Sequence, residues 1–164
     1  MLDLLAIPAC AALNRFRGGG LGASDLPGHP RFYAWAIMAG IALAATLDIV
    51  TAAGFGLAYL IWSFAPWGHL MCLGRKEHEP SRPYAWIETR LLALSNGNVW
   101  FAFGLLHLLF LLPAALMTPW ALAAPLLIVA AYEMSWRLSP KGEIIRNAEV
   151  ATGAVWGALV MLAA

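Results

Sequence analysis

Charged residues are scarce in this sequence, and their scarcity excludes several classes of protein. Only 12% of the 164 residues are charged, and the formal net charge is +1. The chain therefore lacks the basic excess that neutralises nucleic-acid phosphates, and we expect no nucleic acid among its partners. Cysteine is scarce as well. The two cysteines, Cys10 and Cys72, lie far apart in apolar surroundings, which excludes a small secreted domain held together by disulfides.

Apolar residues take the place of the missing charges. Hydrophobic residues make up 62% of the chain, and its mean hydropathy is +0.73. A chain of this size lacks the volume to hide so much apolar surface from water. The apolar runs are continuous and do not alternate, which favours helices over the strands of a barrel. The sequence therefore predicts an all-α, polytopic transmembrane helical bundle with the lipid bilayer as its partner.

Six apolar segments divide the chain, and together they form one transmembrane domain over residues 1–164. A crossing helix needs about 20 residues, so the first segment is either a short span or a half-crossing. The six expected spans cover residues 2–13, 32–48, 52–73, 98–117, 120–137 and 144–164. Shared residues at one constant offset between segments 90–102 and 146–158 are compatible with a bundle built of related helical hairpins, and chance similarity in so biased a composition is the alternative that we favour.

The basic residues gather on one side of this arrangement. If all six segments cross, all ten Lys and Arg residues fall on the same face, and the turns near Asp48 and Pro119 contain none. Cytoplasmic loops carry the excess of Lys and Arg, so we expect the basic loops in the cytoplasm and the C-terminus outside. Tryptophan prefers the membrane interface, and membrane anchoring is the interpretation for most of the eight tryptophans. These are Trp35, Trp62, Trp67, Trp86, Trp100, Trp120, Trp136 and Trp156.

A candidate anion site follows the first segment. Asn14-Arg-Phe-Arg-Gly-Gly-Gly20 places two guanidinium groups beside a glycine run, and glycine allows backbone amides to approach an anion closely. A flexible loop whose arginines serve only topology is the alternative interpretation. The candidate residues for binding an anion or a lipid headgroup are Arg15, Arg17, Gly18, Gly19, Arg90 and Arg146.

Ionisable residues inside or beside the apolar segments form a second group of candidates. His107 lies near the middle of residues 98–117, where an imidazole is costly without a polar partner, and Glu133 is the partner we expect. Such a pair could relay protons or bind a cation, or it could simply hold two helices together. The other intramembrane polar candidates are His69, Glu88 and Glu149. For the charges near the inner interface, we favour structural ion pairs between hairpins over a substrate site.

No established motif for metal, cofactor or catalysis accompanies these residues. His69 and Cys72 share a helix face, but their spacing matches no known metal-binding signature. We therefore predict no metal site and infer no cofactor, and catalysis lacks positive evidence. The pattern Gly153-Ala-Val-Trp-Gly157 permits close helix approach, which we expect within the chain; a homo-oligomer contact is the alternative.

Three stretches carry a resemblance to a known group of proteins. They are the opening Leu5 to Gly20, the Trp67-Gly-His segment and the late Glu143-Ile-Ile-Arg-Asn-Ala148. Together they resemble small multi-pass membrane proteins encoded by tailed phages and prophages. That group has no function to carry over. The resemblance implies a bacterial or viral origin and a location in the cytoplasmic (inner) membrane of a bacterium.

Three functional hypotheses follow. The first is a non-enzymatic protein that binds a lipid, an ion or another protein through its basic cytoplasmic face. The second is a small transporter or channel that uses His107 and Glu133. The third is a lipid-modifying enzyme at the inner leaflet, which predicts that His69, Arg17 and the acidic residues converge on one polar cavity.

Overall fold

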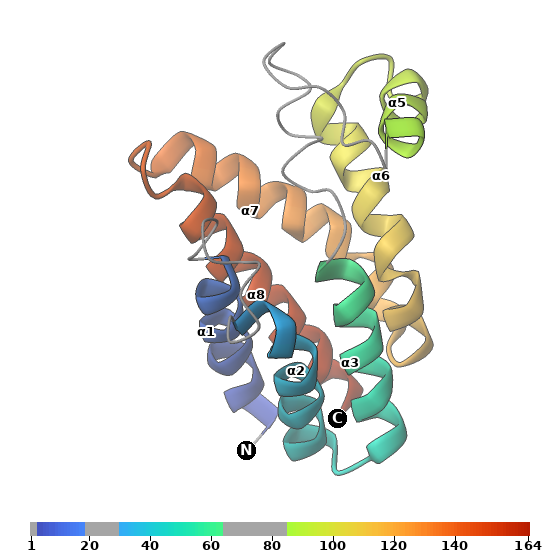
Figure 1. Cartoon of the computed structure of the whole chain (residues 1–164), viewed down its shortest axis with the longest axis vertical. Coiled ribbons are helices and arrows are strands. Elements are labelled where there is room, and N and C mark those ends of the chain that lie inside the picture. Colours follow the sequence, from blue (N-terminus) through green and yellow to red (C-terminus); the bar gives the residue numbers. More distant parts are fainter. Residues whose placement is uncertain (1–2, 19–29, 64–84) are drawn as a thin grey trace.

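The described part of the chain is entirely helical. A computed structural model describes residues 3–18, 30–63 and 85–164, and within these ranges it contains seven α-helices, three 3-10 helices and no strand. The all-α prediction is confirmed for these residues. The helices pack into one bundle, in which α1 (Ala6–Gly18), preceded by η1 (Asp3–Leu5), lies along α8 (Ile144–Ala163) (Figure 1).

The remaining helices complete the bundle around this pair. α2 (Pro30–Thr46) packs on α3 (Ile49–Ser63), and α7 (Ala124–Leu138) packs on α8. α6 (Val99–Leu111) continues into η2 (Leu112–Leu116), and η3 (Pro119–Leu122) leads into α7. α2, α6 with η2, and α8 begin and end within about two residues of the expected segments 32–48, 98–117 and 144–164. α1 runs five residues past the expected end at 13, and residues 64–73 of the expected third segment lie outside the described residues. α5 (Ala85–Leu94) is an additional helix that hydropathy did not predict, because it is short and carries Glu88 and Arg90.

Local signals explain where several helices begin and end. Asp48 accepts a hydrogen bond from the backbone N–H of Thr51 at 2.9 Å and so caps the start of α3. Asn98 caps α6 in the same way by accepting from Phe101 N at 3.0 Å. α5 ends at Leu94, and the turn that follows it contains Gly97, whose φ of 78° is readily adopted by glycine and whose backbone N donates to Leu92 O.

Most helices, as described, have fewer residues than a perpendicular crossing needs, and α1, α2 and α3 each border residues that the structure does not describe. Within the described residues, one helical stretch, Val99–Leu116, is both long and apolar enough to cross a bilayer. α1, α2, α3 and α7 contain 13, 17, 15 and 15 residues, against the roughly 20 that a perpendicular crossing needs. α8 has 20 residues, but its first two turns carry Arg146, Asn147 and Glu149.

The proposed repeat is not reflected in the structure. The constant offset aligns residues 90–102, which form the end of α5, a turn and the start of α6, with residues 146–158, which lie within the single helix α8. Gly97 is in the turn, whereas the matching Gly153 is in the middle of a helix. The two segments therefore have different structures, and the shared letters reflect the biased composition of the chain.

Glycines allow the closest helix contact in the bundle. A Cβ added at Gly153 would lie 2.4 Å from the carbonyl oxygen of Cys10, and one at Gly157 would lie 2.4 Å from Cα of Ile7. Neither distance leaves room for a side chain. The expectation that Gly153 and Gly157 serve packing within the chain is confirmed: they let α8 lie directly against the backbone of α1.

Candidate functional site

A buried cluster of polar side chains lies where four helices meet. Its members come from α1, α3, α7 and α8, and all are buried. This polar cluster consists of Asn14, Arg17, Tyr59, Tyr132 and Glu149. Polar groups buried in an apolar interior are costly unless they bond one another, so their mutual bonds decide what the cluster does.

An ion pair forms the centre of the polar cluster. Arg17 Nη2 lies 2.5 Å from Glu149 Oε2, and the two side chains are 7% and 10% exposed. The Tyr132 hydroxyl donates to the other carboxylate oxygen at 2.9 Å. The guanidinium also lies 4.7 Å from the centre of the Trp62 ring, a cation–π distance. Both oxygens of Glu149 therefore have donors, and the two charges compensate each other in the interior.

Asn14 extends the network to α3. Its side-chain nitrogen donates to the backbone oxygen of Glu149 at 3.1 Å, and its side-chain oxygen accepts from the Tyr59 hydroxyl. Asn14 and Arg17 lie three residues apart on α1, so they share one face of that helix. This face of α1 is thus bonded to α3 and α8 together.

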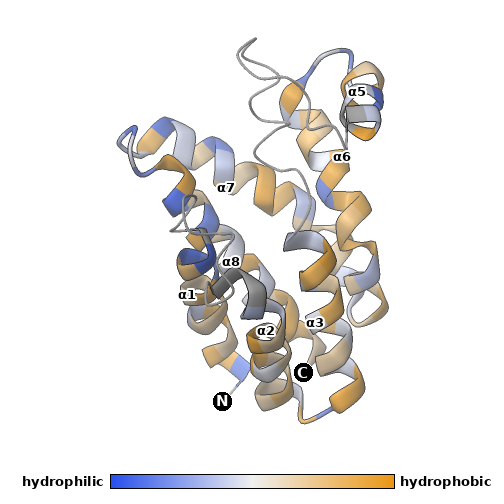
Figure 2. Ribbon diagram, in the orientation of Figure 1, coloured by the Kyte–Doolittle hydropathy of each residue, from blue (hydrophilic) through white to orange (hydrophobic). Residues whose placement is uncertain are grey.

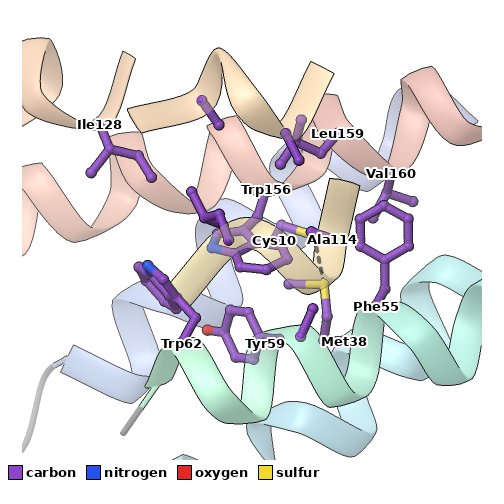
Figure 3. Packing of buried hydrophobic residues seen from close by; sticks show 14 of the residues in the cluster. Cys10, Met38, Phe55, Tyr59, Trp62, Ala114, Ile128, Trp156, Leu159 and Val160 are labelled. Atoms are coloured by element: carbon purple, nitrogen blue, oxygen red, sulfur yellow. Dashed lines mark hydrogen bonds between the residues drawn. The ribbon is translucent and has the colours of Figure 1, made fainter. Parts of the chain in front are cut away.

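Aromatic rings pack beside the polar cluster. The Trp156 ring centre lies 5.2 Å from that of Tyr59 and 5.5 Å from that of Trp62, both in edge-to-face arrangements (Figure 3). Trp62 and Trp156 are fully buried. Membrane anchoring was therefore the wrong interpretation for these two residues, although Trp35, Trp86, Trp120 and Trp136 are exposed. Sequence position near a helix end did not reveal which way each ring faces.

The predicted glycine-run anion site divides between the interior and the surface. α1 continues through Arg15 and Arg17 to Gly18, so the arginines lie on a helix and not in a loop. Arg15 is exposed, whereas Arg17 is held by Glu149. Gly19 lies outside the described residues. One of the two guanidinium groups expected to meet an anion is therefore already neutralised within the chain.

The other predicted cations also differ in their partners. Arg146 pairs with Glu143 three residues earlier. Arg90 is exposed on α5, and its guanidinium lies 6.0 Å from the centre of the Trp86 ring. Nothing is described for the side chain of Glu88, and His69 lies outside the described residues. The ion pair found between different helices joins Glu149 to Arg17 on α1, a residue that was expected at the anion site and not among the pairing charges.

His107 and Glu133 do not contact each other. His107 is fully buried, and its Nδ1 donates to the backbone oxygen of Phe103 at 2.9 Å. Its ring packs 4.3 Å from the Phe103 ring. Glu133 instead accepts a hydrogen bond from Arg137 Nε at 2.6 Å, one turn further along α7. The pairing predicted for these two residues is therefore wrong, because the partner of Glu133 lies on its own helix.

Three members of the polar cluster were missed by sequence reasoning. Asn14 was noted only as the start of the glycine motif, and Tyr59 and Tyr132 were not considered. A usable signal existed, because an amide or a phenol within an apolar segment needs a hydrogen-bond partner when it is buried. The sequence could have marked each residue as a candidate, but it could not have paired them across three helices.

Comparison with known proteins finds no family model, no curated protein and no solved structure that matches this chain. The resemblance to phage-encoded membrane proteins stays a prediction. Among the described residues, no three His, Cys, Asp or Glu side chains are placed to hold a metal ion together. The placement of charge and the exposed apolar surface are therefore the features of the chain that bear on its function.

Proposed function

We propose that this chain is a multi-pass protein of a bacterial cytoplasmic membrane whose basic end binds the anionic headgroups of phospholipids. The observation that carries the proposal is an inverted distribution of polarity. The bundle encloses a buried ion pair, while large apolar side chains cover its outer surface.

The exposed apolar surface is too extensive for contact with water. Among the described residues, twenty-seven large hydrophobic side chains are exposed, and they occur on every α-helix. Leu116 is 87% exposed, and Leu126 and Leu138 are each 76% exposed. Figure 2 shows this apolar character along the outer helices. Soluble monomers rarely expose such continuous apolar area, whereas acyl chains solvate it.

The direction of the helices supports six crossings. Both termini and the turn between α2 and α3 lie at one end of the bundle, and the connection from α7 to α8 and helix α5 lie at the other (Figure 1). The second end carries Arg90, Arg137, Lys141 and Arg146, whereas the turn at Asp48 has no basic residue. This distribution supports the second end as the cytoplasmic one.

Among the basic residues whose side chains the structure describes, three carry charge that is available to a ligand. Arg17, Arg137 and Arg146 each pair with a carboxylate of the same chain. Among the described residues, Arg15, Arg90 and Lys141 are exposed and have no carboxylate partner. An anionic headgroup would meet these three charges without competition. Lys141 was not among the predicted binding residues, and it replaces Arg17 and Arg146 in the proposed set.

Lipid retention tests the proposal. We expect the wild-type chain, released from bilayers of equal phosphatidylglycerol and phosphatidylcholine, to retain phosphatidylglycerol preferentially in native mass spectrometry. Changing Arg15, Arg90 and Lys141 together to Gln should remove this preference, because each basic residue at an anionic surface contributes about 1 kcal/mol.

The matched control changes Arg137 and Arg146 to Gln, two cations that their own helices already neutralise. It should keep most of the preference. Equal retention of both lipids by the wild-type chain would overturn the proposal.

A further inference from the structure

Helix α5 has apolar side chains on two faces. Ile87, Leu91 and Leu92 are partly buried and pack against the core of the bundle. On the outer side, Trp86 is 72% exposed and Leu94 is 71% exposed. A helix that is apolar on more than one side is ordinarily buried, yet α5 lies at the edge of the bundle and packs mainly on α6. Its outer side therefore needs a cover that the described chain does not supply.

The outer side also carries one uncompensated charge. Trp86, Arg90 and Leu94 follow one another at intervals of four residues, so they share one face of the helix, which we name the Trp86 face. The Arg90 guanidinium lies 6.0 Å from the Trp86 ring centre, within the range of a cation–π contact. An indole, a cation and an aliphatic side chain on one helix face are residue types that favour a membrane surface, because indole rings prefer the interface and basic side chains are attracted to anionic headgroups.

We infer that the Trp86 face lies in the headgroup layer of the inner leaflet and holds one anionic phospholipid headgroup against Arg90. This inference rests on the proposed function and assigns a position to the lipid. With α5 lying along the membrane surface, Arg90 binds the phosphate, and Trp86 and Leu94 on either side of it contact the lipid below the headgroup. α5 thereby anchors the cytoplasmic end of α6 to the membrane surface.

Two pairs of residues allow a controlled test. Trp120 is also exposed, at 59%, but it lies in η3, beyond the end of α6 that is opposite α5. No contact between Trp120 and an arginine is described. Arg137 lies at the same end of the bundle as Arg90, but its charge is paired with Glu133. Trp120→Ala is therefore the control for Trp86→Ala, and Arg137→Gln is the control for Arg90→Gln.

Fluorescence quenching in reconstituted bilayers measures the contact. Lipids would carry a spin label on the headgroup, either on phosphatidylglycerol or on phosphatidylcholine. The difference in fluorescence between the wild-type chain and Trp86→Ala is the signal of Trp86. We expect labelled phosphatidylglycerol to quench this signal at about fivefold lower density than labelled phosphatidylcholine. A fivefold difference corresponds to about 1 kcal/mol, the contribution of one basic residue at an anionic surface. Arg90→Gln should abolish that difference, and Arg137→Gln should preserve it. For Trp120, the two probes should quench equally.

The two proposals fail in different ways. Equal quenching of Trp86 by both probes, or the same loss in Arg90→Gln and Arg137→Gln, would overturn the inference about α5. If the whole chain still retained phosphatidylglycerol preferentially in that case, the proposed function would stand. If the chain retained both lipids equally, both would fall.

Discussion

At the scale of single residues, Arg17 determines how α1 is held. Its guanidinium joins Glu149 on α8 and lies against Trp62 on α3, so one side chain links three helices. A buried ion pair costs desolvation energy and often adds little net stability, but leaving one of its charges alone is strongly unfavourable. The pair is therefore a source of specificity: α1 can dock only in the register that brings Arg17 to Glu149.

We predict that Arg17→Gln lowers the free energy of unfolding in detergent micelles by about 3 to 5 kcal/mol, because it leaves Glu149 buried without its cation. Removing both charges, with Arg17→Met and Glu149→Leu, should restore much of that loss. Reversible unfolding followed by tryptophan fluorescence measures both effects. Arg137→Gln is the control, since its pair is exposed and should change stability by less than about 1 kcal/mol. Equal effects of Arg17→Gln and Arg137→Gln would contradict a structural role for the buried pair.

At the scale of elements, the close contact between α1 and α8 depends on two residues of α8 that have no side chain. Gly153 and Gly157 present bare backbone to α1, and the closeness of this contact lets Asn14 reach the backbone oxygen of Glu149. The polar bonds and the glycine contact therefore support each other. Pushing the helices apart would weaken both at once.

Alanine substitutions at glycines test this contact. Gly157→Ala or Gly153→Ala should destabilise the bundle by about 1 to 3 kcal/mol, because the new methyl group meets backbone atoms of α1 that cannot move aside easily. Gly40→Ala is the matched change in α2, where nothing lies within 4 Å of the added carbon. It should be neutral or stabilising by up to about 1 kcal/mol, as expected for replacing glycine within a helix. Thermal melting in detergent ranks the three variants, and similar losses at Gly40 and Gly157 would argue against close packing.

At the scale of the whole molecule, orientation in the bilayer is the property most open to direct measurement. After Cys10 and Cys72 are replaced by alanine, a cysteine at Asp48 should react with a membrane-impermeant maleimide in intact bacterial cells. A cysteine at Lys141 should react only after the cells are opened. The reason is that basic connections are retained in the cytoplasm. Labelling of both positions in intact cells would exclude the proposed orientation.

The sequence alone was sufficient to predict the all-helical class, the positions of most described helices and the lack of basic residues in the turns near Asp48 and Pro119. These properties depend on local composition, because an apolar run of sufficient length favours a helix whatever surrounds it. The cap residues Asp48 and Asn98 act within three residues, so they too are readable from the chain. The short helix α5 was not predicted from the sequence, because its ten residues mix apolar and charged side chains.

Only the tertiary structure decided which polar residues meet. Arg17 and Glu149 are 132 residues apart, and nothing near either position specifies the other. Glu133 was expected to face His107, but a cation one turn away on its own helix is the nearer partner. The same limit applies to Trp62 and Trp156, whose burial depends on the rotation of their helices within the bundle. Partner choice follows from packing between distant segments, and packing is a property of the whole chain.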